Sequence, residues 1–331
     1  MKNKKESERL TIEEYQAKYS KLENGKKFSA YVHLGATIIC LLTLAALFSI
    51  FKTAYDFNKY LGYGVGGVSL VLFVIFILIP IIKIIRANRF ETEVNGISIL
   101  RAQKHNAVVR KKLADQIINL HGSTKKETGW YSEEKIQKLI DAGSDKEQIK
   151  SALNDLYATD IKKKGKDLIF KASLKAGLYS AISQSNLTDS LVVGAVNLQM
   201  VKNVIYLYGF RPSDKKLAKI FTTVISNSLL AYGVADVKIG NGVASMIGGA
   251  AKGIPLLGSV VSVLVDSSVQ GLANAVLTAI IGNSTLKYLI EEYKLQNVID
   301  SIEVPTKEDF ADVCNQLKKE LSSKKSKPIT A

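Results

Sequence analysis

The chain has 331 residues, a formal net charge of +15 and 47% hydrophobic residues. Its two cysteines, Cys40 and Cys314, cannot provide the disulfide framework of a small secreted domain, which fits a reducing compartment. The basic excess is concentrated beside two apolar segments and in the tail Lys318–Lys327, where it would face anionic lipid. We therefore expect a lipid bilayer, and no nucleic acid, as a partner.

Two apolar segments near the N-terminus, residues 30–51 and 61–82, contain no Lys, Arg, Asp or Glu. At about 1.5 Å per residue, a helix of either segment crosses the roughly 30 Å hydrocarbon core of a bilayer. Only residues 52–60 separate them, so the second helix returns the chain to the side it left. The pattern predicts a two-helix transmembrane hairpin over residues 29–86, preceded by a basic segment, residues 1–28.

The distribution of basic residues predicts the orientation of this hairpin. Residues 1–28 and 83–112 have more Lys and Arg than Asp and Glu, whereas the turn has only Lys52 and Lys59. Segments next to a membrane span that are rich in Lys and Arg are retained in the cytoplasm, so both termini are expected to be cytoplasmic. A cleaved signal peptide is not expected, because the apolar run is longer than an ordinary signal core and follows a polar segment that contains the glutamates Glu6, Glu8, Glu13 and Glu14.

Small residues near the outer ends of both spans predict where the spans pack on each other. Ala45, Ala46 and Ser49 lie toward the outer end of the first span, and Gly62 and Gly66 lie at the outer end of the second. Small residues let helix backbones approach closely in a membrane. We therefore expect the outer halves of the two spans to be in contact.

Residues 87–160 are expected to form a charged helical connector, with one helix over 102–120, and then a helical hairpin. The inward positions of the first short helix of this hairpin are expected to be Ile136, Leu139 and Ile140. Ser144 and Glu147 are spaced as a capping box for the second helix. A helix that reads nucleic acid is the alternative, but packing alone accounts for the pattern.

Residues 161–305 are expected to form an all-helical cytoplasmic domain. Its long helices are predicted over residues 161–184, 188–209 and 214–235. The tract 243–282 is rich in glycine and other small residues, which predicts a tightly packed buried hairpin, with re-entry into the membrane as the alternative. Residues 306–331 are expected to form a C-terminal helix and basic tail. The predicted fold class is all-α, a transmembrane helical hairpin followed by a cytoplasmic all-helical domain.

The sequence lacks the motifs of the common catalytic and cofactor sites. The closest match to a phosphate-binding loop, residues 253–260, has Ser259 where the loop needs the lysine that reaches the terminal phosphates. There is no His-Glu-x-x-His, Cys-x-x-Cys or Gly-x-Ser-x-Gly motif. We therefore expect no enzyme activity, no cofactor and no metal site.

Two segments carry a resemblance to a known family. The run DSLVVGAVNL at residues 189–198, followed by Tyr208-Gly209, and the run QGLANAVLTAIIG at residues 270–282 resemble the C-terminal domain of YcjF-like bacterial inner-membrane proteins. The order of parts along the chain agrees with that family. The chain departs from the family at Ser183-Gln184, where Ser-Pro is frequent, at Ala195-Val196, where Trp-Arg is frequent, and at Ile280, where the family often has Arg.

The resemblance implies a protein of the bacterial inner membrane whose function is undefined. The family is linked to a stress-associated GTPase, which suggests a partner and not a reaction. The motif residues are predicted to have either a structural role or a role in contact with a partner. They are Asp189, Asn197, Tyr208, Gly209, Arg211, Gly271, Thr278 and Gly282. From the residues alone, Asp189 can cap a helix, Gly209 can end one, and Asn197 needs a hydrogen-bond partner in an apolar helix.

Two hypotheses about function follow. The first is an inner-membrane-anchored helical adaptor that binds a GTPase or stress-response partner, with Tyr208 and Arg211 as exposed interface anchors. The alternative roles for these two side chains are a core tyrosine and a solvated helix cap. The second hypothesis is a membrane-active stress or defence protein whose tract 243–282 inserts and oligomerises. A homo-oligomer is compatible with both.

Overall fold

The computed structural model describes residues 25–92, 99–123, 132–182, 186–231, 270–302, 311 and 314–319. Within these residues the chain is helical and contains no strand, apart from one isolated parallel β-bridge between Asn88 and Phe210. The expected all-α class is therefore confirmed. Residues 1–24, residues 243–269 of the glycine-rich tract, and most of the expected tail lie outside the described part of the chain.

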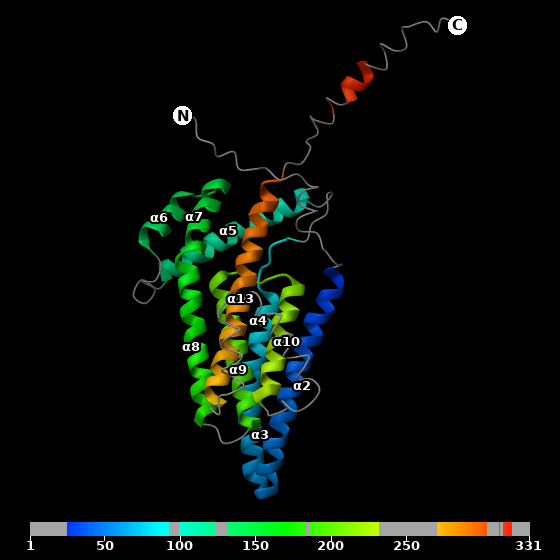
Figure 1. The fold of residues 1–331 in the computed structure, drawn as a ribbon, viewed down its shortest axis with the longest axis vertical. Helices are drawn as coiled ribbons and strands as arrows, with labels where there is room; N and C mark the ends of the chain where they lie inside the picture. The colour runs from blue at the N-terminus through cyan, green and yellow to red at the C-terminus, as the bar shows by residue number, and fades with distance from the viewer. Residues whose placement is uncertain are drawn as a thin grey trace, which may run out of the picture.

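The hairpin consists of α2 (Gly25–Phe57), α3 (Lys59–Phe73), a π-helical turn η1 (Val74–Leu78) and α4 (Ile79–Arg86). By length and composition, Phe28–Phe57 and Lys59–Arg86 can each cross a membrane. The two expected spans are thus present as helices that pack against each other (Figure 1). Pro80 lies in the first turn of α4, and the wide π turn just before it accommodates a ring that would obstruct a regular helix.

The turn of the hairpin is shorter than we expected. Residues 52–57 continue α2, and Asn58 alone separates the two helices. The Asn58 side-chain oxygen accepts hydrogen bonds from the backbone N–H groups of Tyr60 at 2.9 Å and Leu61 at 3.3 Å. A capping asparagine therefore starts α3 where the sequence suggested a loop.

The outer ends of the two spans are in contact, as expected, through the predicted glycines. A Cβ at Gly62 would lie 2.6 Å from the Tyr55 Cα, and a Cβ at Gly66 would lie 2.8 Å from the Phe51 ring. The expected partners on the first span were wrong: Ala45, Ala46 and Ser49 do not meet these glycines. They line a cavity of about 310 Å³ between the hairpin and helices α9 and α10, which are described below.

Three helices form what we call the head: α5 (Ile99–Ser123), α6 (Glu133–Asp141) and α7 (Lys146–Ala158). Gly143 follows α6 with φ of +52°, a backbone conformation that glycine adopts easily. The cap of α7 is Asp145 and not Ser144, because the Asp145 carboxylate accepts from the backbone N–H groups of Glu147 and Gln148 at 2.9 and 3.0 Å. The predicted capping residue was therefore wrong by one position.

The inward face of α6 is narrower than we expected. Ile136 and Leu139 are fully buried, whereas Ile140 is 44% exposed. Two apolar positions per two turns are enough to hold a short helix against α5 and α7.

The bundle consists of α8 (Asp160–Ile182), α9 (Asn186–Tyr208), α10 (Asp214–Ala231) and α13 (Gln270–Asp300). The three helices predicted before residue 236 are confirmed within a few residues of their expected ends. In Figure 1, α8 and α13 run side by side, and α9 and α10 lie between them and the hairpin.

The bundle and the hairpin share one hydrophobic core. Phe221 of α10 packs on α2 so closely that a Cβ at Gly35 would lie 3.2 Å from the Phe221 Cβ. A single cluster of buried side chains extends from Val32 and Ile77 of the hairpin to Val201 and Phe221 of the bundle. Leu187–Tyr208, most of α9, is a third helix long and apolar enough to cross a membrane.

Candidate functional site

The segment that leaves the hairpin, residues 87–92, is bound to residues 209–214, which comprise the loop between α9 and α10 and the first residue of α10. We call these two segments the joint. Beside the bridge from Asn88 to Phe210, the Arg211 backbone N–H donates to the Asn88 carbonyl oxygen at 2.7 Å. The loop between α9 and α10 is thus hydrogen-bonded to the chain where it leaves the hairpin.

Gly209 ends α9, as the sequence predicted. Its φ of +73° lies in the left-handed region, and a Cβ there would lie 2.5 Å from a Leu113 methyl carbon of α5. Its backbone N–H donates to the carbonyl oxygens of Ile205 and Tyr206. Both the turn and the closeness of α5 therefore require glycine at this position.

Three charged groups meet in the joint. The Asp214 carboxylate accepts from the Arg211 guanidinium at 2.6 Å and from the Arg89 guanidinium at 3.1 Å. Asp214 also lies in the first turn of α10, where a negative charge is favourable. Arg211 is only 9% exposed, so it is neither the exposed anchor nor the solvated cap that the sequence suggested.

The joint rests on a cluster of aromatic rings. Its members, with contacting ring centroids 4.4 to 6.2 Å apart, are Phe90, Tyr157, Tyr208, Phe210 and Tyr293. The Tyr157 hydroxyl donates to the Tyr208 carbonyl oxygen at 2.5 Å, and burial raises the pKa of the Tyr293 hydroxyl far above its usual range. Tyr208 is 1% exposed, so the alternative of a core tyrosine is confirmed and the exposed anchor of the adaptor hypothesis is wrong.

A second group of motif residues lies at the far end of the bundle. The Asp189 carboxylate is buried and accepts from the Ser180 hydroxyl at 3.0 Å. The Asn274 side-chain amide in turn donates to the Ser180 hydroxyl oxygen at 2.6 Å. Since α9 begins at Asn186, Asp189 lies inside its first turn, and the prediction that it caps the helix was wrong.

Asn197 and Thr278 are fully buried in the same bundle. We expected Asn197 to need a hydrogen-bond partner, but its side-chain atoms find none among the described residues, nor does the Thr278 hydroxyl. The Asn227 side chain of α10 is likewise buried, and its atoms have no hydrogen-bond partner among the described residues. Three of the predicted motif residues, Asp189, Asn197 and Thr278, are therefore polar groups in the interior of one bundle.

Of the two motif glycines of α13, Gly282 permits close helix packing, as expected, and the Gly271 backbone lies against a glycine of α8. A Cβ at Gly282 would lie 2.6 Å from the Ile169 side chain of α8 and 2.9 Å from the Met200 sulfur of α9. At Gly177 of α8, a Cβ would lie 2.9 Å from the Gly271 carbonyl oxygen. These contacts hold α13 against α8 and α9.

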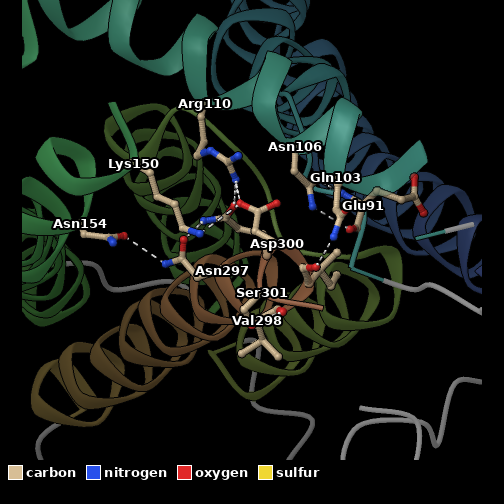
Figure 2. Close-up of polar contacts among 12 residues, drawn as sticks. Glu91, Gln103, Asn106, Arg110, Lys150, Asn154, Asn297, Val298, Asp300 and Ser301 are labelled. Carbon is tan, nitrogen blue, oxygen red and sulfur yellow. Dashed lines mark hydrogen bonds and ion pairs between the residues drawn. The ribbon is translucent and has the colours of Figure 1, made fainter. Parts of the chain in front are cut away.

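Figure 2 shows a polar network that the sequence did not predict, between the head and the end of α13. The Arg110 guanidinium of α5 forms an ion pair with Asp300 and donates to the Gln296 amide oxygen. The Lys150 ammonium of α7 lies 3.5 Å from the same Asp300 oxygen. One carboxylate of α13 therefore holds cations from two helices of the head.

Further hydrogen bonds fix the head to its neighbours. The Gln103 amide donates to the last carbonyl oxygens at the end of α13, of Ile299 at 2.9 Å and of Ile302 at 3.0 Å. The Asn106 side chain accepts from the Glu91 backbone N–H and donates to the Glu91 carbonyl oxygen, at 2.8 and 3.1 Å (Figure 2). Through α5, the head thus contacts both the bundle and the segment that leaves the hairpin.

The burial of Arg110 has a signal in the sequence that we did not use. Ala102, Asn106, Val109 and Leu113 mark one buried face of α5, and Arg110 lies on that face.

Burial raises the pKa of the Asp300 carboxyl, while the charges of Arg110 and Lys150 act in the opposite direction.

A second carboxylate ties the segment after the hairpin to the bundle. Glu292 of α13 is buried and accepts from the Thr92 hydroxyl at 2.5 Å. The Lys216 ammonium of α10 lies 3.0 Å from the other Glu292 oxygen and 3.2 Å from Glu291. The polar groups of this region thus stabilise the arrangement of the helices.

The described residues contain no cluster of three or more His, Cys, Asp or Glu side chains placed to hold a metal ion. The buried carboxylates that the structure does show, Asp189, Asp214, Glu292 and Asp300, each have a hydrogen-bond or ion-pair partner within the chain. Their arrangement is suited to holding helices together.

A family model described as a domain of unknown function (DUF697) matches residues 144–303. The match covers just under half of the chain and contains α7, the four bundle helices and the two motif segments. No curated protein and no solved structure matches the chain. The chain therefore contains a DUF697 domain, which the model's description does not connect with an activity.

Proposed function

We propose that this protein is an adaptor that holds a cytosolic protein partner at the membrane to which its hairpin anchors it. Two apolar helices long enough to span a bilayer and a helical domain packed directly on them support this proposal. Motifs of common catalytic and phosphate-binding sites are missing from the sequence. An anchored binding surface accounts for these features without a reaction.

The observation that carries the proposal is the way the head is fixed. Arg110 and Lys150 of the head meet Asp300 of α13, and Asn106 binds the backbone of Glu91 just after the hairpin. A partner on the head would therefore be held in a defined orientation relative to the membrane helices. Such a rigid coupling would set the orientation of a bound partner, whereas a flexible tether would supply only proximity.

The resemblance to YcjF-like proteins supports a more specific form of the proposal. In it the membrane is the bacterial inner membrane, the head and both termini are cytoplasmic, and the partner is a GTPase involved in a stress response. The basic residues that flank the hairpin support the orientation.

Burial of Tyr208 and Arg211 moves the expected contact surface to the head. Among the described residues of α6 and α7, Ile140 is the only large apolar side chain that is exposed. Protein interfaces have an apolar core surrounded by a polar rim. We therefore take the face of α6 around Ile140 as the contact surface to test.

The experiment uses the full chain purified in mild detergent from its own host. We expect a GTPase to copurify with the wild-type chain, to be lost with Ile140→Asp, and to be retained with Lys146→Asp, a charge change at an exposed position of α7. The purified chain by itself should not hydrolyse GTP. Intrinsic GTP turnover by the pure chain, or no nucleotide-hydrolysing partner after chemical cross-linking, would contradict the proposal.

The second candidate function, a membrane-active protein, is favoured by one observation. Phe170, Leu174 and Leu178, spaced four residues apart on α8, are each more than half exposed, and α9 is a third apolar helix. A bundle that enters the bilayer would place these side chains in lipid. Release of a trapped dye from vesicles by the purified chain would support this candidate. Vesicles that retain the dye would favour the adaptor function instead.

A further inference from the structure

A groove of about 1040 Å³ lies where the second span ends. One wall is α4 and the residues after it, a second is the C-terminal half of α5, and a third is residues 205–209 at the end of α9. It includes the joint residues Asn88 and Gly209 and is separate from the network around Asp300. The volume is that of a site for a sizeable organic ligand.

The charge of the groove has one sign. Lys83 and Arg86, three residues apart on α4, line it, and no Asp or Glu is among its described lining residues. The Lys83 ammonium lies 5.6 Å from the centre of the Tyr206 ring of α9, on the opposite wall. Both cationic side chains are exposed and have no ion-pair partner among the described residues. The groove is therefore suited to an anionic group.

The remaining lining is apolar toward the span and polar toward the head. Ile79 and Ile82 continue the apolar surface of the second span into the groove, and both are exposed. Gln116 and Asn119 of α5 add side-chain amides that can donate hydrogen bonds. Cations and amides next to an apolar wall at the end of a span match a phosphate headgroup with its acyl chain.

We propose that this groove binds one anionic phospholipid. The phosphate contacts Lys83 and Arg86, and an acyl chain lies along Ile79 and Ile82 toward the bilayer. The proposal rests on the membrane crossing of the hairpin and is independent of any protein partner. Basic pockets beside transmembrane helices bind anionic headgroups for the same physical reason. Since Asn88 and Gly209 form part of the walls, a bound lipid would also brace the joint.

The test compares lipids on the full chain in detergent. Native mass spectrometry measures the apparent dissociation constants of added phosphatidylglycerol and phosphatidylcholine. Wild type should bind phosphatidylglycerol more tightly. Lys83→Gln with Arg86→Gln should weaken this binding by about 25-fold, from roughly fivefold per basic side chain near an anionic surface. The control, Lys111→Gln with Lys112→Gln, removes the same charge from exposed positions of α5 that do not line the groove.

Three outcomes would overturn the proposal. Equal phosphatidylglycerol affinity in wild type and the Lys83/Arg86 double variant would show that these two side chains do not bind the lipid. An equal loss in the Lys111/Lys112 control would mean that net charge alone attracts the lipid. Displacement of phosphatidylglycerol by glycerol phosphate at similar concentration would indicate a site for soluble phosphates. Because both side chains are exposed, we expect the lipid-free double variant to fold normally. An unchanged helical spectrum and an unchanged melting temperature would confirm this.

Discussion

Arg110 and Asp300 are two charged side chains that are almost completely removed from water, which costs solvation free energy. The Arg110 side chain is 6% exposed, and its charge is balanced by Asp300 and by the amide oxygen of Gln296. A buried pair of this kind contributes little net stability compared with an apolar pair, but removal of one partner leaves the other uncompensated. The network therefore determines which face of the head meets α13.

Arg110→Ala should lower the free energy of unfolding by about 3 to 5 kcal/mol, because it leaves Asp300 and Gln296 without their main donor. A guanidinium titration of the full chain in detergent, followed by circular dichroism, measures the loss. Lys171→Ala is the control, since Lys171 pairs with Asp167 on the exposed face of α8 and should matter little. Equal effects of the two changes would show that the network does not hold the head.

The titration of Asp300 predicts a pH dependence. Because burial raises its pKa above the ordinary value of 3.8, the native state holds this proton more tightly than the unfolded state does. The stability from this group is thus fully present below the unfolded pKa and is lost as the pH rises through the folded pKa. Asp300→Asn cannot titrate, so wild-type stability relative to this variant should fall as the pH rises. A relative stability that increases with pH would mean that Arg110 and Lys150 outweigh burial.

Pairs of helices in this protein are held at short distances where glycines allow it. At Gly62 the nearest atom to an added Cβ is the Tyr55 Cα, so one backbone would have to move. At Gly64 and Gly67, on the same helix, an added Cβ would meet nothing within 4 Å. The helix α3 therefore has a close glycine face and an open one.

Gly62→Ala should destabilise the hairpin by about 1 to 3 kcal/mol, because the methyl group forces the two spans apart. Gly64→Ala should leave stability unchanged or raise it slightly, since alanine favours helix more than glycine does. Thermal unfolding of both variants in the same detergent provides the comparison. If Gly64→Ala were the more damaging change, the observed faces of the hairpin would be wrong.

The helices themselves were largely predictable, and their contacts were not. Apolar periodicity, Gly143 and Gly209 placed the helix ends within a few residues, because these signals act locally. The starts of α3 and α7 were misplaced, since Asn58 and Asp145 supply caps that the apolar pattern did not indicate. The burial of Arg211 depends on Asn88 and Asp214, and no local pattern indicates that Asn88 lies beside Phe210.

In the molecule as a whole, the bundle and the membrane hairpin form one body. Phe221 of α10 packs on α2, α9 packs beside α4, and the joint binds the chain that leaves the hairpin. A span that is apolar on every side has no face marked for contact with protein, so its pattern did not indicate that the bundle would bury Val32 and Ile39. Removal of the hairpin would uncover this core, and tests of function therefore need the full chain.

The most direct test of a membrane-anchored adaptor with a cytoplasmic head is the accessibility of two engineered thiols in intact cells. Cys40 and Cys314 are first replaced by Ser, and Thr53→Cys or Ser144→Cys is then introduced, at exposed positions near the tip of the hairpin and on the head. With a maleimide that does not cross membranes, we expect the thiol at position 53 to be labelled in intact cells. The thiol at position 144 should be labelled only after the membrane is opened. Labelling at position 144 in intact cells, with position 53 protected, would contradict the account.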